Sequence, residues 1–309
     1  MNGMLLAAGH GTRMEPLSSW VAKPALDVLG RPLLTSALVH LRELGCTRIA
    51  ANLHRHPDQV EAALRTAAAG STPVLLSREA ALLGGAGGVA AARDLLGAGA
   101  VLVANTDIWA ALDLAPLLAA LADEAIVLAL LPHPDPARWS SVLLDDDGRV
   151  TAFLPAGAPV DRTPYLYTGF QLLGGGAVAA LPPPPAEWRP VWLAAKERGL
   201  LRGAVVAGRW REAGTPAAYR DLVLAELGAS AWIHPGATVG AGAVVGRSAV
   251  ASACSIAAGA RVVDSVLLAG AAIVGAARLA RCVVAGPVRV AAGESLADTL
   301  VLPDRRVAL

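Results

Sequence analysis

The stretch Met4-Leu-Leu-Ala-Ala-Gly-His-Gly-Thr-Arg-Met14 decides how the first part of this chain folds. Its beginning, residues 4–8, predicts a short buried strand because every side chain in it is apolar. Gly9 and Gly11 then end the run, and glycines allow backbone N–H groups to approach an anion closely. The stretch predicts a strand followed by an anion-binding turn, with a tight turn that binds nothing as the alternative.

The composition is typical of a neutral chain of two domains. Its 309 residues carry a formal net charge of +1, without the positive field that nucleic acids or acidic membranes attract. Three cysteines without metal-ligand spacing indicate reduced thiols in the core. Mean hydropathy is +0.52, but Gly, Pro or charged residues interrupt the apolar segments before they could span a bilayer. No signal peptide precedes the first strand, so we expect a cytoplasmic protein that binds neither nucleic acid nor membrane.

Helical and strand patterns alternate between residues 33 and 227, which predicts an α/β fold with a mixed, mainly parallel, Rossmann-like sheet and flanking helices. The predicted helices cover 33–44, 57–68, a stretch ending at 96, 113–123, 188–199 and 216–227. The predicted strands cover 48–53, 73–77, 100–104, 125–131, 165–173 and 201–207, with a hairpin at 142–153. Ligands of such sheets bind beyond the carboxyl ends of the strands, where the turn after residue 8 is expected.

From residue 230 an apolar residue recurs roughly every six positions with small residues between, which predicts a left-handed parallel β-helix of hexapeptide repeats. We expect about four coils of ~18 residues, made irregular by shorter steps and by Pro287. The sequence thus predicts two domains, 1–228 and 229–309. Acyl transfer would need a general base, usually a histidine, and the tail contains a single histidine, His234. We therefore expect the tail to form a homo-oligomer or to have a regulatory role, with acyl transfer as the alternative.

Three blocks in fixed order resemble the signature of the sugar-1-phosphate nucleotidylyltransferases: LLAAGHGTRMEPL at 5–17, AKPAL at 22–26 and VLGRPLL at 28–34. The catalytic part is similar to members of the mannose-1-phosphate guanylyltransferase and N-acetylmuramate-1-phosphate uridylyltransferase type. The resemblance implies that a nucleoside triphosphate and a sugar 1-phosphate react, with Mg²⁺ as cofactor, to give an NDP-sugar and pyrophosphate. A regulatory paralogue that only binds nucleotide sugars is the main alternative.

The resemblance also implies a role for each matching residue. Catalytic roles fall to Arg13 and Lys23, and Lys23 is one of only two lysines among 26 basic residues. The implied nucleotide-binding residues are Leu6, Ala7, Ala8, Gly9, His10, Gly11, Thr12, Glu79, Gly84, Gly85 and Gly87. The implied sugar-binding residues are Asn105, Thr168 and Gly169, and the implied metal ligands are Asp107 and Glu212.

Four positions depart from the family pattern. Gly85 stands where Thr is common, Leu82 where many uridylyltransferases have Gln, and Glu212 where the family has Asp. No Glu-Lys-Pro follows Phe153, which leaves the sugar phosphate to another residue such as Arg149 or Arg162. Simpler structural readings also stay open: a flexible helix-entry loop at the glycines, a helix N-cap at Asp107 and a surface ion pair at Glu212. The base and the sugar are not fixed by the sequence.

Overall fold

The structure is a computed structural model that describes residues 1–71 and 73–309. These residues form two compact units, Met1–Gly9 with Leu34–Trp210 (unit 1) and His10–Leu33 with Arg211–Leu309 (unit 2). The compact units therefore divide the chain differently from the sequence-based boundary after residue 228. Residues 10–33, called the signature loop below, and the helix at 216–227 belong with the tail.

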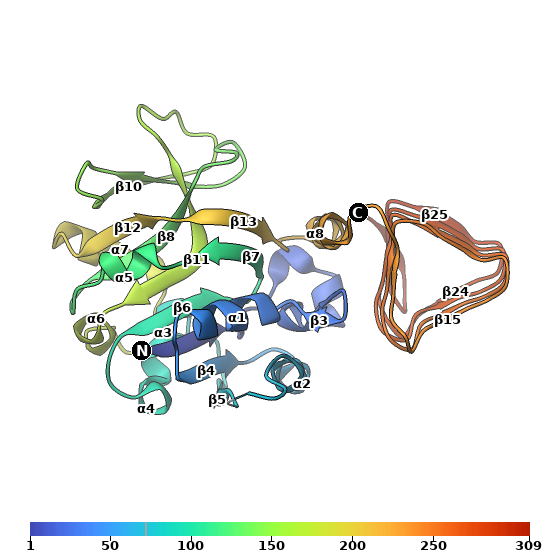
Figure 1. Cartoon of the computed structure of the whole chain (residues 1–309), viewed down its shortest axis with the longest axis horizontal. Helices are drawn as coiled ribbons and strands as arrows, with labels where there is room; N and C mark the ends of the chain where they lie inside the picture. The colour runs from blue at the N-terminus through green and yellow to red at the C-terminus, as the bar shows by residue number, and fades with distance from the viewer. Residues whose placement is uncertain (72) are drawn as a thin grey trace. The chain divides into compact units, whose positions relative to one another are not determined.

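Unit 1 is built on a nine-stranded sheet in the order β10-β9-β11-β6-β1-β4-β5, in which β8 also pairs with β11 and β12 pairs with β8 (Figure 1). Its strands are β1 Asn2–Leu6, β4 Arg48–Leu53, β5 Leu75–Arg78, β6 Val101–Asn105, β8 Ile126–Pro132, β9 Ser141–Leu144, β10 Val150–Leu154, β11 Tyr165–Leu173 and β12 Leu201–Val205. The pairs β1–β4, β1–β6, β4–β5 and β8–β12 are parallel, whereas β11 runs antiparallel to β6 and β8. The predicted mixed, mainly parallel sheet is confirmed.

The helices of unit 1 agree with the sequence pattern except at one place. They are α1 Thr35–Glu43, α2 Pro57–Ala67, α3 Gly85–Ala91, α4 Arg93–Leu96, α5 Pro116–Ala119, α6 Gly175–Ala179 and α7 Trp188–Glu197. The predicted helix over 113–123 is wrong, because only α5 is helical there. None of the helices in the described part of the chain is long and apolar enough to cross a membrane.

An additional strand, β7 (Ile108–Asp113), precedes α5 and pairs with β13 (Ala207–Glu212) in a separate two-stranded sheet. Two buried polar side chains of α1 bind its backbone. The Ser36 hydroxyl accepts the Ala110 N–H at 2.8 Å, and His40 Nε2 accepts the Leu112 N–H at 3.0 Å. These bonds satisfy backbone groups that would otherwise be buried without partners, and they explain why an apolar helix contains Ser and His.

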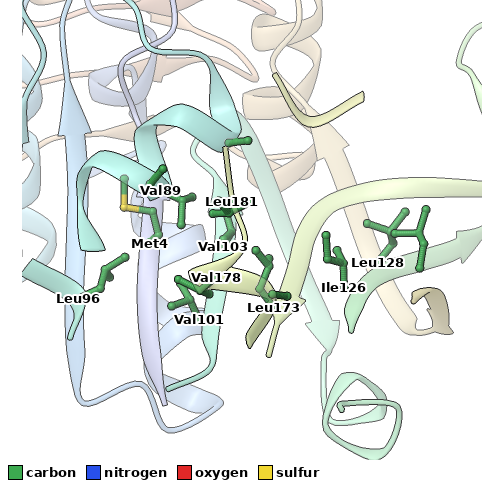
Figure 2. Close-up of a cluster of buried hydrophobic side chains, with 14 of the residues drawn as sticks. Met4, Val89, Leu96, Val101, Val103, Ile126, Leu128, Leu173, Val178 and Leu181 are labelled. Carbon is green, nitrogen blue, oxygen red and sulfur yellow. The ribbon is translucent and has the colours of Figure 1, made fainter. Parts of the chain in front are cut away.

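One hydrophobic cluster of unit 1 lies between the sheet and the helices α3, α4, α6 and α7. Met4 from β1, Val101 and Val103 from β6 and Leu173 from β11 are fully buried there. Figure 2 shows these side chains together with Val89 of α3 and Val178 of α6. Burying β1 in this way fixes its carboxyl end, from which the signature loop departs.

Unit 2 contains a parallel β-helix, visible as stacked triangular coils in Figure 1. Its strands are β14 Trp232–Ile233, β15 Thr238–Val239, β16 Val244–Val245, β17 Ala249–Val250, β18 Ser255–Ile256, β19 Arg261–Val263, β20 Val266–Leu267, β21 Ala272–Ile273, β22 Arg278–Ala280, β23 Val283–Val284, β24 Arg289–Val290, β25 Ser295–Ala297, β26 Thr299–Val301 and β27 Arg306–Ala308. Two of the three faces are four-stranded sheets, so the expected number of coils is confirmed.

The coils are shorter and more regular than expected. Equivalent residues of adjacent coils are 17 positions apart, as in the ion pair Arg247–Asp264, rather than ~18. The short step between β16 and β17 recurs at the same corner in each later coil, and Ala272 still pairs with Arg289 across the coil that contains Pro287. The predicted irregularity is therefore wrong, because the shorter steps are part of the repeat.

Helix α8 (Pro216–Leu227) packs on one face of these coils, against β17 and β23. The outward residues of that face, Ala249 and Val283, are buried. The Thr215 hydroxyl caps the helix by accepting the Ala218 N–H at 3.1 Å, which satisfies one of the N–H groups left open at a helix start. The short motif Gly-Thr-Pro at 214–216 thus begins the helix that covers the β-helix.

Candidate active site

The carboxyl end of β1 is held by a side-chain network of unit 1. Asn52 Oδ1 accepts the Ala7 N–H at 2.8 Å, and Asn52 Nδ2 donates to Glu79 Oε1 at 2.8 Å. The other carboxylate oxygen of Glu79 accepts the Leu83 N–H at 3.2 Å. Both carboxylate oxygens therefore join β1 to the start of the glycine loop, and Glu79 positions backbone here. Its implied contact with the nucleotide stays a prediction.

The glycine loop at 84–88 packs against the segment 184–188 of unit 1. An added Cβ at Gly84 would lie 2.4 Å from the Ala186 carbonyl, and one at Gly85 would lie 2.4 Å from Trp188 Nε1. Two backbone bonds join the segments: Ala186 N–H donates to Leu83 O at 2.7 Å, and Gly87 N–H donates to Ala186 O at 2.9 Å. Close packing against the segment 184–188 thus explains these glycines, and it explains why no Thr stands at position 85.

The sugar-binding candidates gather around β6 and β11. Gly169 has a φ of +89°, and an added Cβ would lie 3.2 Å from the Asn105 side chain. The hydroxyl of Thr168 is buried and donates to Ala129 O at 2.9 Å, while Trp210 Nε1 donates to Thr168 O at 2.9 Å. The structure brings Asn105 and Gly169 together, and it uses the Thr168 side chain inside the fold.

Four aromatic side chains form a cluster that sequence reasoning missed. Phe153 stacks on Trp192 at 5.6 Å between ring centroids, Tyr167 meets Trp192 edge-on at 5.1 Å, and Trp188 stacks on Trp192 at 6.3 Å. All four side chains are partly exposed. Burial, and then the negative charge of Asp107, raise the pKa of Tyr167. The cluster (called the aromatic wall below) therefore lies within electrostatic reach of Asp107. Trp188 and Trp192, four residues apart on one helix face, were its signal in the sequence.

The two arginines considered for the sugar phosphate lie elsewhere, beside the turn between β9 and β10. Arg149 pairs with Asp147 at 3.0 Å, and Arg162 donates to Leu144 O at 3.3 Å. Arg162 lines a pocket of about 410 Å³ with three aspartates, Asp145, Asp146 and Asp161. An acidic lining repels phosphate, so this pocket is a poor sugar-phosphate site. The Asp-Gly turn predicted at 145–148 is confirmed.

The signature loop belongs to unit 2 and carries both catalytic candidates. Gly11 adopts the left-handed conformation, with φ +62°, and its carbonyl accepts the Ser18 hydroxyl at 3.0 Å. Thr12–Met14 and Lys23–Ala25 each form one turn of 3-10 helix. The loop then makes the hairpin β2 (Asp27–Val28) and β3 (Arg31–Pro32). A left-handed residue within short turns is a backbone shape that can form an anion-binding concavity, and the anion-binding role of this loop stays a prediction.

Arg13 and Glu212 form an ion pair within unit 2. The Glu212 side chain is 13% exposed and that of Arg13 is 64% exposed. An added Cβ at Gly214 would lie 3.1 Å from the Arg13 guanidinium, so the glycine leaves room for this pair. The ion pair foreseen as the simpler reading of Glu212 is confirmed, and its role as a metal ligand stays a prediction.

The two carboxylates expected to bind Mg²⁺ belong to different units. Asp107 follows β6 in unit 1, and Glu212 ends β13 in unit 2. Within residues 1–71 and 73–309 no three histidine, cysteine, aspartate or glutamate side chains gather as a metal site. Mg²⁺ needs only one or two carboxylates when phosphate oxygens and water complete its shell. Both side chains are of the type that Mg²⁺ takes, and the metal-ligand role of each stays a prediction.

His234, the candidate general base of the tail, stabilises the turn in which it lies. Its Nδ1 accepts the Gly236 N–H at 2.9 Å, and its ring lies 5.9 Å from that of Trp232. A nitrogen that accepts a backbone hydrogen bond is less available as a general base. The three cysteines are free and buried, as expected.

Comparison with known proteins agrees with the signature. Residues 2–167 match the family model described as nucleotidyl transferase, and residues 227–300 match that of the GlmU-like C-terminal hexapeptide. N-acetylmuramate alpha-1-phosphate uridylyltransferase from Caulobacter vibrioides is 32% identical over 229 residues, which cover 70% of this chain and 92% of the relative. The same enzyme of Neisseria meningitidis is 41% identical over 116 residues, 37% of this chain and about half (49%) of the relative's length.

More distant relatives share the fold. Mannose-1-phosphate guanylyltransferase of Mycobacterium tuberculosis is 28% identical, over 70% of this chain and 62% of its own. The crystal structure of HddC from Yersinia pseudotuberculosis superposes with a TM-score of 0.62 at 23% identity, covering 72% of this chain and 97% of that one. The signature, the fold and these matches together show that the chain belongs to the nucleotidyl transferase family, among the sugar-1-phosphate nucleotidylyltransferases that carry a hexapeptide-repeat tail.

Proposed function

We propose that this chain joins a nucleoside triphosphate to a sugar 1-phosphate, giving an NDP-sugar and pyrophosphate. The observation that carries the proposal is the intact signature loop, with Arg13 and Lys23, departing from the buried end of β1. A phosphate oxygen of the sugar 1-phosphate attacks the α-phosphorus in line while pyrophosphate leaves on the opposite side. No covalent intermediate with the protein is needed.

The protein's own part is to position the phosphates and to stabilise negative charge. Backbone N–H groups of residues 9–12 bind phosphate oxygens, and Arg13 and Lys23 stabilise the charge that develops on the α-phosphate and on the leaving pyrophosphate. Asp107 and Glu212 would hold Mg²⁺, which would neutralise phosphate charge when bound.

The first substrates to test are UTP and N-acetylmuramate 1-phosphate. The reason is that the match to the Caulobacter N-acetylmuramate alpha-1-phosphate uridylyltransferase covers 92% of that enzyme. GTP with mannose 1-phosphate comes second, after the Mycobacterium relative. The aromatic wall replaces the missing Glu-Lys-Pro as the sugar contact in this proposal. Aromatic rings pack against the C–H faces and acyl methyl groups of sugars, which favours an N-acylated sugar over an unsubstituted hexose.

The experiment is pyrophosphate release by the purified chain with Mg²⁺, for UTP, dTTP, GTP, CTP and ATP against 1-phosphates of N-acetylmuramate, N-acetylglucosamine, glucose and mannose. We expect one dominant pair that contains an N-acylated sugar. A productive pair with plain mannose or glucose would contradict the proposed sugar class. If no pair reacts while nucleotide sugars still raise the melting temperature, catalysis itself is refuted and binding alone remains.

A further inference from the structure

Gln171 of β11 is a polar side chain in an apolar layer of unit 1. It is fully buried, and its register partners on the neighbouring strands are Val103 of β6 and Leu128 of β8. Both partners are fully buried members of the hydrophobic cluster. A buried amide normally finds a hydrogen-bond partner for each of its polar groups. The partners of this amide therefore indicate what the residue does.

Only one of the two polar groups of the Gln171 amide is paired. Its Oε1 accepts the indole N–H of Trp192 at 2.8 Å. Because an indole N–H can only donate, this bond fixes the orientation of the amide, with the NH2 group directed away from Trp192. Within residues 1–71 and 73–309, the buried Nε2 has no hydrogen-bond acceptor. A buried donor without an acceptor destabilises the fold, so an apolar side chain of equal size would suit this layer better.

Trp192 is the central ring of the aromatic wall. It contacts all three other members, Phe153, Tyr167 and Trp188, at centroid distances of 5.6, 5.1 and 6.3 Å. No side chain of α7, the helix that carries Trp192, is buried. Trp192 itself is partly exposed, so the hydrogen bond to a buried strand residue adds a fixed point that packing alone does not supply.

We propose that Gln171 is a positioning residue of the sugar site, whose amide oxygen fixes the orientation of Trp192 and, through Trp192, that of the aromatic wall. The inference rests on the proposed function, in which this wall contacts the sugar of the sugar 1-phosphate. A wall that is already oriented loses less conformational freedom when it packs against a ligand. Gln171 thus raises the affinity for the sugar from a buried position, and its unpaired Nε2 lowers the stability of the fold.

The first test is a double-mutant cycle on sugar binding. Gln171→Met keeps the length of the side chain and removes the acceptor, and Trp192→Phe keeps a ring and removes the donor. Each of the four sugar 1-phosphates named above is titrated by calorimetry, and the tightest is carried through the variants. We expect Gln171→Met to raise its dissociation constant about three- to tenfold, the range that one hydrogen bond is worth. In the Trp192→Phe background the same change should have no further effect.

The matched control is Leu172→Met. Leu172 is the next residue of β11, so its side chain lies on the opposite face of the sheet, and it is buried as completely as Gln171. This variant should leave the affinity for the sugar 1-phosphate unchanged.

Two further measurements need no ligand. The chain has seven tryptophans, and Trp192→Phe identifies the indole N–H signal of Trp192 in a nitrogen–proton correlation spectrum by its loss. This N–H should exchange with deuterium several-fold faster in Gln171→Met than in wild type. The melting temperature of Gln171→Met should not fall, because the variant also removes the unpaired Nε2. A purely structural role predicts a fall in melting temperature with unchanged sugar affinity.

The outcomes separate this inference from the proposed function. Unchanged exchange of the Trp192 N–H, wild-type sugar affinity in Gln171→Met, or an equal loss of affinity in both backgrounds would overturn the positioning role alone. A chain that binds none of the four sugar 1-phosphates, although exchange of the Trp192 N–H still depends on Gln171, would refute the proposed function and overturn the positioning role with it.

Discussion

One methyl group at Gly85 tests how the glycine loop is packed. The added Cβ of Gly85→Ala would lie 2.4 Å from Trp188 Nε1 and 2.5 Å from Trp188 Cδ1. Trp188 is itself stacked on Trp192, so the indole has to leave that contact to make room. Overpacking of this kind costs about 1–3 kcal/mol. Up to ~1 kcal/mol of this cost is offset at the start of α3, because Ala is a better helix former than Gly.

The expected net loss is therefore about 1–2 kcal/mol, or a fall of roughly 3–6 °C in the unfolding transition of unit 1. Differential scanning calorimetry of wild type, Gly85→Ala, Trp188→Ala and the double variant measures this loss and the coupling between the two sites. In the Trp188→Ala background the same change should be neutral or stabilising. Gly275→Ala, whose new Cβ lies no closer than 3.5 Å to a neighbour, should change little. An equal loss in both backgrounds would refute the assigned contact.

Three further variants test the proposed chemistry and the loop. Lys23→Ala should lower kcat for pyrophosphate release by about 10²–10³-fold with an unchanged melting temperature, and Lys196→Ala should leave kcat as it is; equal rates in both would exclude the role of Lys23. Trp192→Leu should raise KM for the sugar 1-phosphate roughly tenfold and leave KM for the nucleotide unchanged, whereas Leu193→Ala, exposed on the same helix, should alter neither. Burial raises the pKa of Asp27, so its charged form is disfavoured in the folded state and stability falls as pH rises through that pKa. Asp27→Asn should therefore raise the melting temperature at pH 7 and not at pH 3; a gain of equal size at both would contradict the sign.

The sequence predicted the parts of the fold that depend on local pattern. The apolar run ending at residue 8, the alternation of helices and strands and the six-residue spacing of the tail all appear in the structure. It could not predict β7, because that strand depends on hydrogen bonds from Ser36 and His40, which lie some seventy residues earlier. The 17-residue coil was missed because the shorter steps were read as interruptions of a hexapeptide pattern.

The candidate site shows the same division. The family resemblance implies roles for Arg13, Lys23 and Asp107 without any knowledge of contacts, and these roles stay predictions. The glycines at 84–88 were expected to approach a nucleotide or to form a flexible helix-entry loop, and the sequence could not show that Ala186 and Trp188 pack on them. The aromatic wall combines side chains from β10, β11 and α7, so no single window of sequence contains it.

The signature loop is held by contacts with residues that come much later in the sequence. The Tyr219 hydroxyl donates to Asp27 O across 192 positions of sequence, and an added Cβ at Gly30 would meet the Trp232 ring at 2.9 Å. During synthesis on the ribosome, residues 10–33 emerge before Tyr219 and Trp232 have been translated. These contacts therefore form late, as contacts between residues distant in sequence do. A nascent chain stopped before α8 would hold β1 and the glycine loop in place, yet its loop would lack the support of Tyr219 and Trp232. Nucleotide binding is thus expected to appear only once the chain has been translated beyond Trp232.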